Sequence, residues 1–102
     1  MAITPRHVHF VCRQSTKNGF TQRGGIFTTS SWRISDRVAE SVDALYLHDR
    51  KSVISWAQGE VVARRKVPAL KGFRWEFDVL LDDVPSCWPQ GQRGGGPEKA
   101  YV

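Results

Sequence analysis

Three of the four tryptophans lie among small polar residues, where an aromatic ring can form the wall of a binding pocket. Trp32 follows a run of four hydroxyl residues, Trp56 precedes Ala-Gln-Gly, and Trp88 lies in a proline- and glycine-rich stretch. Stacking of a base on such a ring contributes roughly 1–3 kcal/mol, and hydroxyl or amide groups can read the base edge. The pattern favours an aromatic pocket for a planar base, although the same rings could pack the rims of a sheet. The candidate side chains are Thr28, Trp32, His48, Trp56, Gln58 and Trp88. Trp75, in the clearest strand pattern, is expected in the core.

Basic residues occur in two groups that could follow a phosphate backbone. One group lies in the polar stretch that contains Asn18-Gly19, and the other is the Arg-Arg-Lys run after Val61-Val62-Ala63. Contacts of this kind give binding that weakens steeply with salt. The alternative is a solvated face without a partner. The candidate phosphate-binding residues are Lys17, Arg23, Arg64, Arg65 and Lys66.

The three histidines offer a different chemistry. His7 and His9 share one face of a predicted strand, and His48 ends another. Two histidines can act as general acid and base, as in a small ribonuclease, and three can hold zinc with an open site. No acidic ligand or partnered nucleophile lies nearby in the sequence. We therefore predict no catalytic residues, no metal and no cofactor. The glycine-rich 91–99 stretch lacks the GK[ST] ending of a P-loop.

The composition is that of a folded chain with a basic bias. The 102 residues are 40% hydrophobic and 25% charged, and a net charge of +5 gives a pI near 9.7. Residues 1–74 carry thirteen basic and five acidic side chains, whereas residues 75–102 carry two and five. This imbalance favours a polyanionic partner. The length predicts a single domain, which is either a whole protein or one module of a longer one.

The sequence also bears on location. No apolar run approaches the roughly 20 residues that span a bilayer, and no secretory signal pattern is visible. Cys12 and Cys87 lack CxxC spacing and are expected as free thiols. We expect a cytoplasmic protein without a membrane partner. The sequence does not predict its oligomeric state.

Hydrophobic periodicity predicts the elements. Strands are expected over 7–13 and 44–48, over 53–67 with an interruption at Gln58-Gly59, and over 73–81, which alternates most cleanly. The 26–34 stretch is a short strand or an extended lead into a helix. That helix has Ser35 as N-cap, Val38 and Val42 as its apolar stripe, and an end near Asp43.

Turn-forming residues predict the connections. Residues 15–25 and 82–102 are expected as loops, with 85–102 as a proline- and glycine-rich wrapping or mobile segment. The sum is an α+β fold of four to six strands with one or two short helices. We expect a small mixed, mainly antiparallel sheet that closes toward a pseudo-barrel.

The order of features over residues 26–63 resembles the PUA-like superfamily, which includes EVE and ASCH domains. The resemblance is carried by 26–32, by 42–48 and by 55–62, where a glycine precedes an apolar pair. It implies a pseudo-barrel that binds RNA or a modified DNA base in an aromatic pocket. It also implies that Phe27, Thr28 and Trp32 form one pocket wall, with His48 and Trp56 on the other.

We therefore predict a non-catalytic module that binds nucleic acid, RNA or DNA, and reads a base, modified or flipped, between Trp32 and Trp56. One alternative is a small histidine-dependent ribonuclease or toxin. Another is a protein-interaction domain that uses an exposed strand edge or the C-terminal segment. This two-ring base site requires both indole rings to line one cleft.

Overall fold

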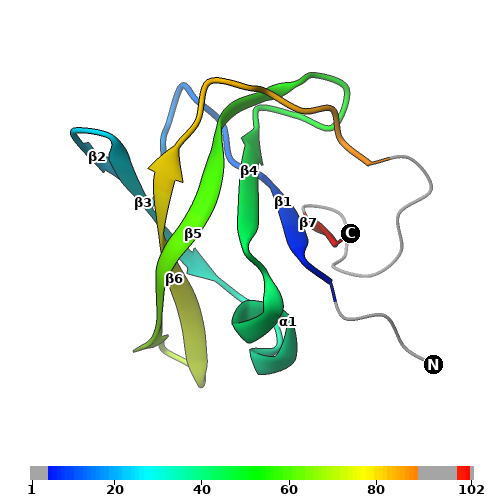
Figure 1. Cartoon of the computed structure of the whole chain (residues 1–102). Coiled ribbons are helices and arrows are strands. Elements are labelled where there is room, and N and C mark those ends of the chain that lie inside the picture. The colour runs from blue at the N-terminus through cyan, green and yellow to red at the C-terminus, as the bar shows by residue number, and fades with distance from the viewer. Residues whose placement is uncertain (1–4, 90–98, 102) are drawn as a thin grey trace.

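The computed structural model describes residues 5–89 and 99–101, which form one seven-stranded mixed sheet and a short helix (Figure 1). Across the sheet the strand order is β2-β3-β6-β5-β4-β1-β7. Only β1 and β4 pair in parallel; all other neighbours are antiparallel. The elements are β1 (His7–Val11), β2 (Phe20–Arg23), β3 (Ile26–Trp32), α1 (Asp36–Ser41), β4 (Ala44–His48), β5 (Ser55–Pro68), β6 (Phe73–Leu81) and β7 (Lys99–Tyr101).

The prediction of a mixed, mainly antiparallel sheet with little helix is confirmed, but closure into a barrel is wrong. The sheet remains open because β2 and β7 are its two edges. Two strands lie where the sequence predicted loops: β2 in the polar 15–25 stretch and β7 near the C-terminus. Both are short and have little apolar alternation, so the residues alone did not mark them as strands. The glycine-rich part of the predicted 85–102 segment lies outside the described residues.

The alternation of β6 places Trp75, Phe77 and Val79 in the core, as predicted for this strand. They pack against fully buried side chains from β1, β3 and β4, including Phe10 and Phe27. Every second residue of a strand faces the same side, so one face of the sheet supplies most of this core. The opposite face of β4 and β5 carries polar side chains.

β5 runs without a break through Gln58 and Gly59, where the sequence predicted an interruption. Its register against β6 shifts at Val62 instead. Gly59 is glycine because β6 passes very close: a Cβ there would lie 1.8 Å from the carbonyl oxygen of Leu80. The glycine therefore marks a close backbone approach rather than a bend.

α1 forms as predicted. The Ser35 hydroxyl accepts a hydrogen bond from the Val38 amide at 3.3 Å, which is the expected N-cap geometry. Val38 and Val42 pack into the core. The helix has six residues. Within the described residues, no helix is long and apolar enough to cross a membrane.

A segment that we call the strap, residues 82–89, lies over the polar face of β4 and β5. Two hydrogen bonds join Ser86 to Ser55. The Ser55 amide donates to the Ser86 carbonyl at 2.9 Å, and the Ser86 amide donates to the Ser55 hydroxyl at 3.0 Å. The Gln58 side chain donates to the Asp82 carbonyl at 2.5 Å. The strap thus shields the polar residues of the inner strands.

Candidate functional site

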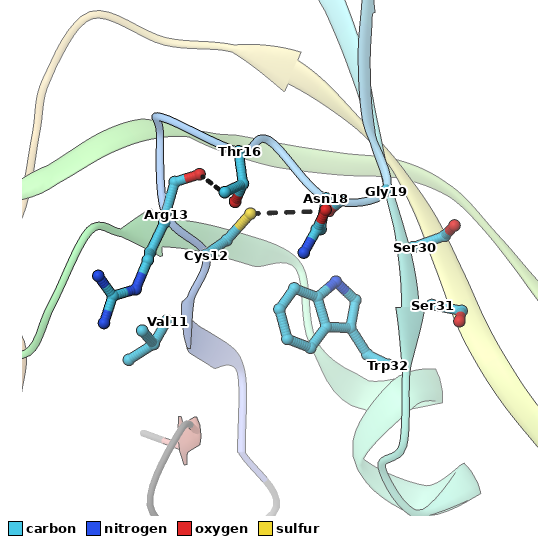
Figure 2. A pocket seen from close by; sticks show the side chains of 9 residues that line it. All are labelled: Val11, Cys12, Arg13, Thr16, Asn18, Gly19, Ser30, Ser31 and Trp32. Carbon is cyan, nitrogen blue, oxygen red and sulfur yellow. Dashed lines mark hydrogen bonds between the residues drawn. The ribbon is translucent and has the colours of Figure 1, made fainter.

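A pocket of about 600 Å³ lies between the end of β1 and the end of β3 (Figure 2). Backbone and side chains of the 13–19 loop form one side, and the last residues of β3 form the other. Trp32 is its one aromatic residue. The lining residues are Val11, Cys12, Arg13, Thr16, Asn18, Gly19, Ser30, Ser31 and Trp32.

A β-bulge in β3 shapes one wall of this pocket. The register shifts between Thr29, which pairs with Phe77, and Trp32, which pairs with Trp75, so β3 has one extra residue there. A bulge re-aims side chains near a strand end. Ser30 and Ser31 therefore leave the regular ladder with β6 and line the pocket.

The opposite wall is tied to β3 at Gly19. The Ser30 amide donates to the Gly19 carbonyl at 2.9 Å. Gly19 has φ +68°, and a Cβ there would lie 1.6 Å from the Ser30 carbonyl oxygen. Only glycine meets both demands, so the Asn18-Gly19 pair holds the loop against the strand.

The Trp32 indole is held in one orientation. Its ring stacks on Phe10 with a centroid distance of 4.0 Å and an interplanar angle of 5°, and its Nε1–H donates to the Thr29 hydroxyl at 3.0 Å. Phe10 covers one ring face. Figure 2 shows the ring nearly face-on from the pocket, below Asn18. The pocket therefore contains a fixed aromatic surface.

Four polar side chains of the pocket lining have no hydrogen-bond or ion-pair partner among the described residues, whereas the Thr16 hydroxyl donates to the Arg13 carbonyl at 3.3 Å. No hydrogen bond or ion pair links the side chains of Arg13, Asn18, Ser30 or Ser31 to any other described residue. No carboxylate lines the pocket. The arrangement combines one cation, amide and hydroxyl groups, and an aromatic face, which suits a planar ligand with an anionic group.

The predicted cleft between Trp32 and Trp56 is not present, because the two rings line separate pockets. Trp56 lines a second cavity of about 590 Å³ together with Asp82 and Asp83. Its Nε1–H donates to the Cys12 carbonyl at 2.7 Å, and its ring packs on Phe20. Trp56 is thus mainly a packing residue at the edge of the core.

Four other predicted base contacts serve the fold. Phe27 and His48 have no exposed surface, so neither offers a face to a ligand. The Gln58 amide bonds Ser55 and the strap, and the Thr28 hydroxyl donates to Asp78 at 2.6 Å. These partners come from distant parts of the chain, which local sequence does not reveal.

Three of the predicted phosphate-binding residues form contacts within the protein instead. Arg64 donates to the carbonyls of Ala39 and Val42 at the end of α1. Lys66 pairs with Asp36 at 2.8 Å. Arg65 pairs with Glu76 and Asp78, and this guanidinium lowers the pKa of the Asp78 carboxyl.

The remaining two predicted phosphate contacts lie apart. The Lys17 ammonium lies 5.9 Å from the centroid of the Phe20 ring, in the loop that lines the pocket. Arg23 lines a different cavity with Thr28 and Arg65. Arg13 and Asn18, which sequence reasoning missed, are polar residues of the pocket lining. The sequence signal that could have found them is the end of an apolar strand followed by an Asn-Gly turn.

The histidines form a buried pair rather than an open acid–base site. His48 Nδ1–H donates to the Val53 carbonyl at 2.9 Å, so His48 Nε2 accepts from His9 Nδ1–H at 2.8 Å. Trp88 lies edge-on to both rings, with centroid distances of 6.0 and 5.1 Å. Burial, then the neighbouring His48 and His7, lower the pKa of His9 to about 4. Among the described residues no group of three or more potential ligands could hold a metal ion.

We compared the chain with known proteins. No family model matches it, and neither a curated protein nor a solved structure is similar to it. The PUA-like resemblance and the cytoplasmic location therefore stay predictions, and the pocket beside Trp32 is the site that the geometry favours.

Proposed function

We propose that this chain is a nucleic-acid-binding module that takes one nucleotide base into the pocket beside Trp32. The observation that carries the proposal is the fixed indole ring in one pocket with Arg13 and Asn18, whose side chains have no partner among the described residues. A base on the open ring face would extend the stack that Phe10 and Trp32 already form. This retains Trp32 from the sequence-based site and replaces its other wall by Arg13 and Asn18.

The physical roles follow from the chemistry of each group. The Asn18 amide has donors and an acceptor for a base edge. The Arg13 guanidinium can hold a phosphate through two parallel hydrogen bonds. Among the described residues no carboxylate lines the pocket, and the nearby Asp49 is bound to the Gln14 amide at 3.0 Å. The pocket volume exceeds the roughly 300 Å³ at the lower end of small-molecule sites, so base and sugar both fit.

The pocket accepts a base only when the base is out of its stack. Extrusion from a duplex costs a few kcal/mol, least for a mismatched, damaged or already unpaired base. The preferred substrate is therefore a single strand or a duplex with a weakened pair. RNA and DNA remain alternatives, to be separated by paired oligonucleotides of the same sequence.

A direct test is a titration with labelled single-stranded oligonucleotides. Loss of a base-stacking ring costs roughly 1–3 kcal/mol of binding free energy. We therefore expect Trp32→Ala to raise Kd by about 5- to 150-fold. Because Trp32 also packs on Phe10, Arg13→Glu provides a second variant at an exposed position. We expect Arg13→Glu to weaken binding at least tenfold and to reduce its salt dependence by about one phosphate contact.

Two control variants define the result. Arg37→Glu makes the same charge change on the exposed surface of α1 and should alter Kd less than Arg13→Glu. Trp56→Ala removes the other candidate ring. Binding that responds to Trp56→Ala and ignores both Trp32→Ala and Arg13→Glu would place the site elsewhere and refute the proposal.

The ribonuclease alternative gains no support from the histidine pair. General acid–base catalysis needs groups within hydrogen-bond reach of a substrate proton. His9 and His48 bond each other, and 3% and 0% of their surfaces are exposed. The pair is better explained as a polar part of the fold.

A further inference from the structure

The hairpin that joins β5 to β6 extends beyond the rest of the sheet and forms one end of the molecule (Figure 1). Its last ladder pair is Pro68 with Phe73. The turn is closed by the Ala69 amide, which donates to the Gly72 carbonyl at 3.0 Å, and Gly72 adopts φ +72°. We call residues 67–74 the hairpin tip.

The tip exposes large apolar side chains. Leu70 is completely exposed, with a relative accessibility of 106%, and Phe73 is 60% exposed. Neither belongs to the hydrophobic core. Leaving such groups in water forfeits the free energy that burial would contribute, so the tip is suited to insertion into an apolar or stacked environment.

The tip is also positively charged. No aspartate or glutamate occurs between Glu60 and Glu76, whereas the same stretch holds five lysines and arginines. Lys71 is exposed, and neither it nor Arg74 forms an ion pair with the described residues. Lys66 lies 5.3 Å from the centroid of the Phe73 ring. Arg64, Arg65 and Lys66 are held by internal partners, so Lys71 and Arg74 are the two cations of the tip that remain to complement a polyanion.

The sheet register connects the tip to the proposed base pocket. Trp32 pairs with Trp75, and Trp75 pairs with Lys66 on the next strand. Phe73, the first residue of β6, lies two residues from Trp75, or roughly 7 Å at the rise of a strand. That separation is smaller than the width of a DNA major groove, about 12 Å. Both features therefore fit within one nucleic-acid site.

We propose that the hairpin tip inserts Leu70 and Phe73 into a nucleic-acid duplex, where they fill the gap left by a base that has moved into the Trp32 pocket. This inference rests on the proposed function. Apolar wedges between base steps are an established way of unstacking a duplex. Lys71 and Arg74 contact the phosphates beside the gap. The tip therefore acts on duplexes and has no role with single strands.

The test compares one duplex, which carries a single mismatch, with the single strand of the same sequence. Leu70→Ser/Phe73→Ser should weaken duplex binding about tenfold and leave single-strand binding within twofold. Both residues are exposed, so the variant should fold, which circular dichroism verifies. Ile54→Ser, a 55% exposed apolar residue near the other end of β5, is the matched control and should change neither affinity.

A second readout monitors the base itself. With 2-aminopurine in the mismatched pair, wild-type protein should raise the fluorescence of the duplex, and the double variant should lose most of that rise. Equal affinities of wild type and double variant for the duplex would overturn the inference. So would tip-dependent binding to vesicles of anionic phosphatidylserine with duplex binding unchanged, because the tip would then be a membrane contact.

Failure of the proposed function is distinguishable from failure of the tip. Trp32→Ala should weaken binding to the single strand and to the duplex alike. If Trp32→Ala and Arg13→Glu leave single-strand binding unchanged, the pocket proposal fails and this inference fails with it. If those variants act as expected and the double variant does not, only the tip inference is wrong.

Discussion

Replacement of Gly59 by alanine is expected to lower the free energy of unfolding by about 3 kcal/mol or more. The new Cβ would lie 1.8 Å from the Leu80 carbonyl oxygen and 2.8 Å from its carbon. Both atoms belong to the backbone of β6, so no side-chain rotation relieves the clash. Since β5 and β6 are paired in the middle of the sheet, the two strands must separate locally.

The measurement is thermal or urea unfolding followed by circular dichroism. For a domain of this size, 1 kcal/mol shifts Tm by roughly 4–8 °C, so we expect a drop of roughly 12–24 °C. Gly25→Ala is the matched control, because nothing lies within 4 Å of a Cβ there. Unfolding midpoints that are equal in the two variants would show that β5 and β6 are farther apart than described.

Acidification from pH 7.5 toward 4 is expected to destabilise the protein through His9. The ring is 3% exposed, stacks on Tyr46 at 4.3 Å and donates to His48. Burial, followed by the charges of His48 and His7, lowers the pKa of His9 from 6.5 to about 4. Burial likewise lowers the pKa of His48. The folded state therefore prefers the neutral pair.

The sign follows from this lowered pKa. Well above pH 6.5 the histidine is neutral in both states, and the full stability is present. As pH falls from 6.5 to about 4, His9 binds a proton in the unfolded chain but stays neutral in the folded chain. The free energy of unfolding therefore decreases by about 3 kcal/mol. Below the folded pKa this contribution levels off.

Urea unfolding at several pH values between 4.5 and 7.5 measures the effect. His9→Gln, which keeps an N–H donor but does not titrate, should remove most of the slope. His7→Gln, at an exposed position, should retain it. A slope that persists in His9→Gln would assign the pH dependence to other groups. The range avoids the acidic region where Asp36 and Asp78, whose pKa values are lowered by hydrogen bonds, become protonated.

The prediction of elements succeeded where the signal was local. The alternation of 73–81 marked β6, and Ser35 with Val38 and Val42 marked α1. Prediction failed for β2 and β7, whose residues become strands only because β3 and β1 offer them partners. Pairing with a distant strand is a non-local condition, and four or three residues carry too little pattern to show it.

The two predicted pocket walls lie apart in the structure. Trp32 lines one pocket and Trp56 lines another, and base binding by Trp32 stays a prediction. At the β3 bulge, which adds one residue between Thr29 and Trp32, Ser30 and Ser31 leave the ladder with β6, and their side chains point away from the 13–19 loop (Figure 2). The residue types at 29–32 do not predict this bulge.

The amino-acid sequence by itself determined the alternating strands, the capped helix and the positive charge, because each depends on residue types and spacing over a few positions. Only the tertiary structure decided what the charges and rings do. Arg64, Arg65 and Lys66 form hydrogen bonds with partners 11 to 30 residues away in the chain. The side chains of Arg13 and Asn18 have no partner among the described residues, and the nearby Asp49 carboxylate accepts from the Gln14 amide instead. Availability of a side chain depends on which groups folding places next to it, and that is set by long-range packing.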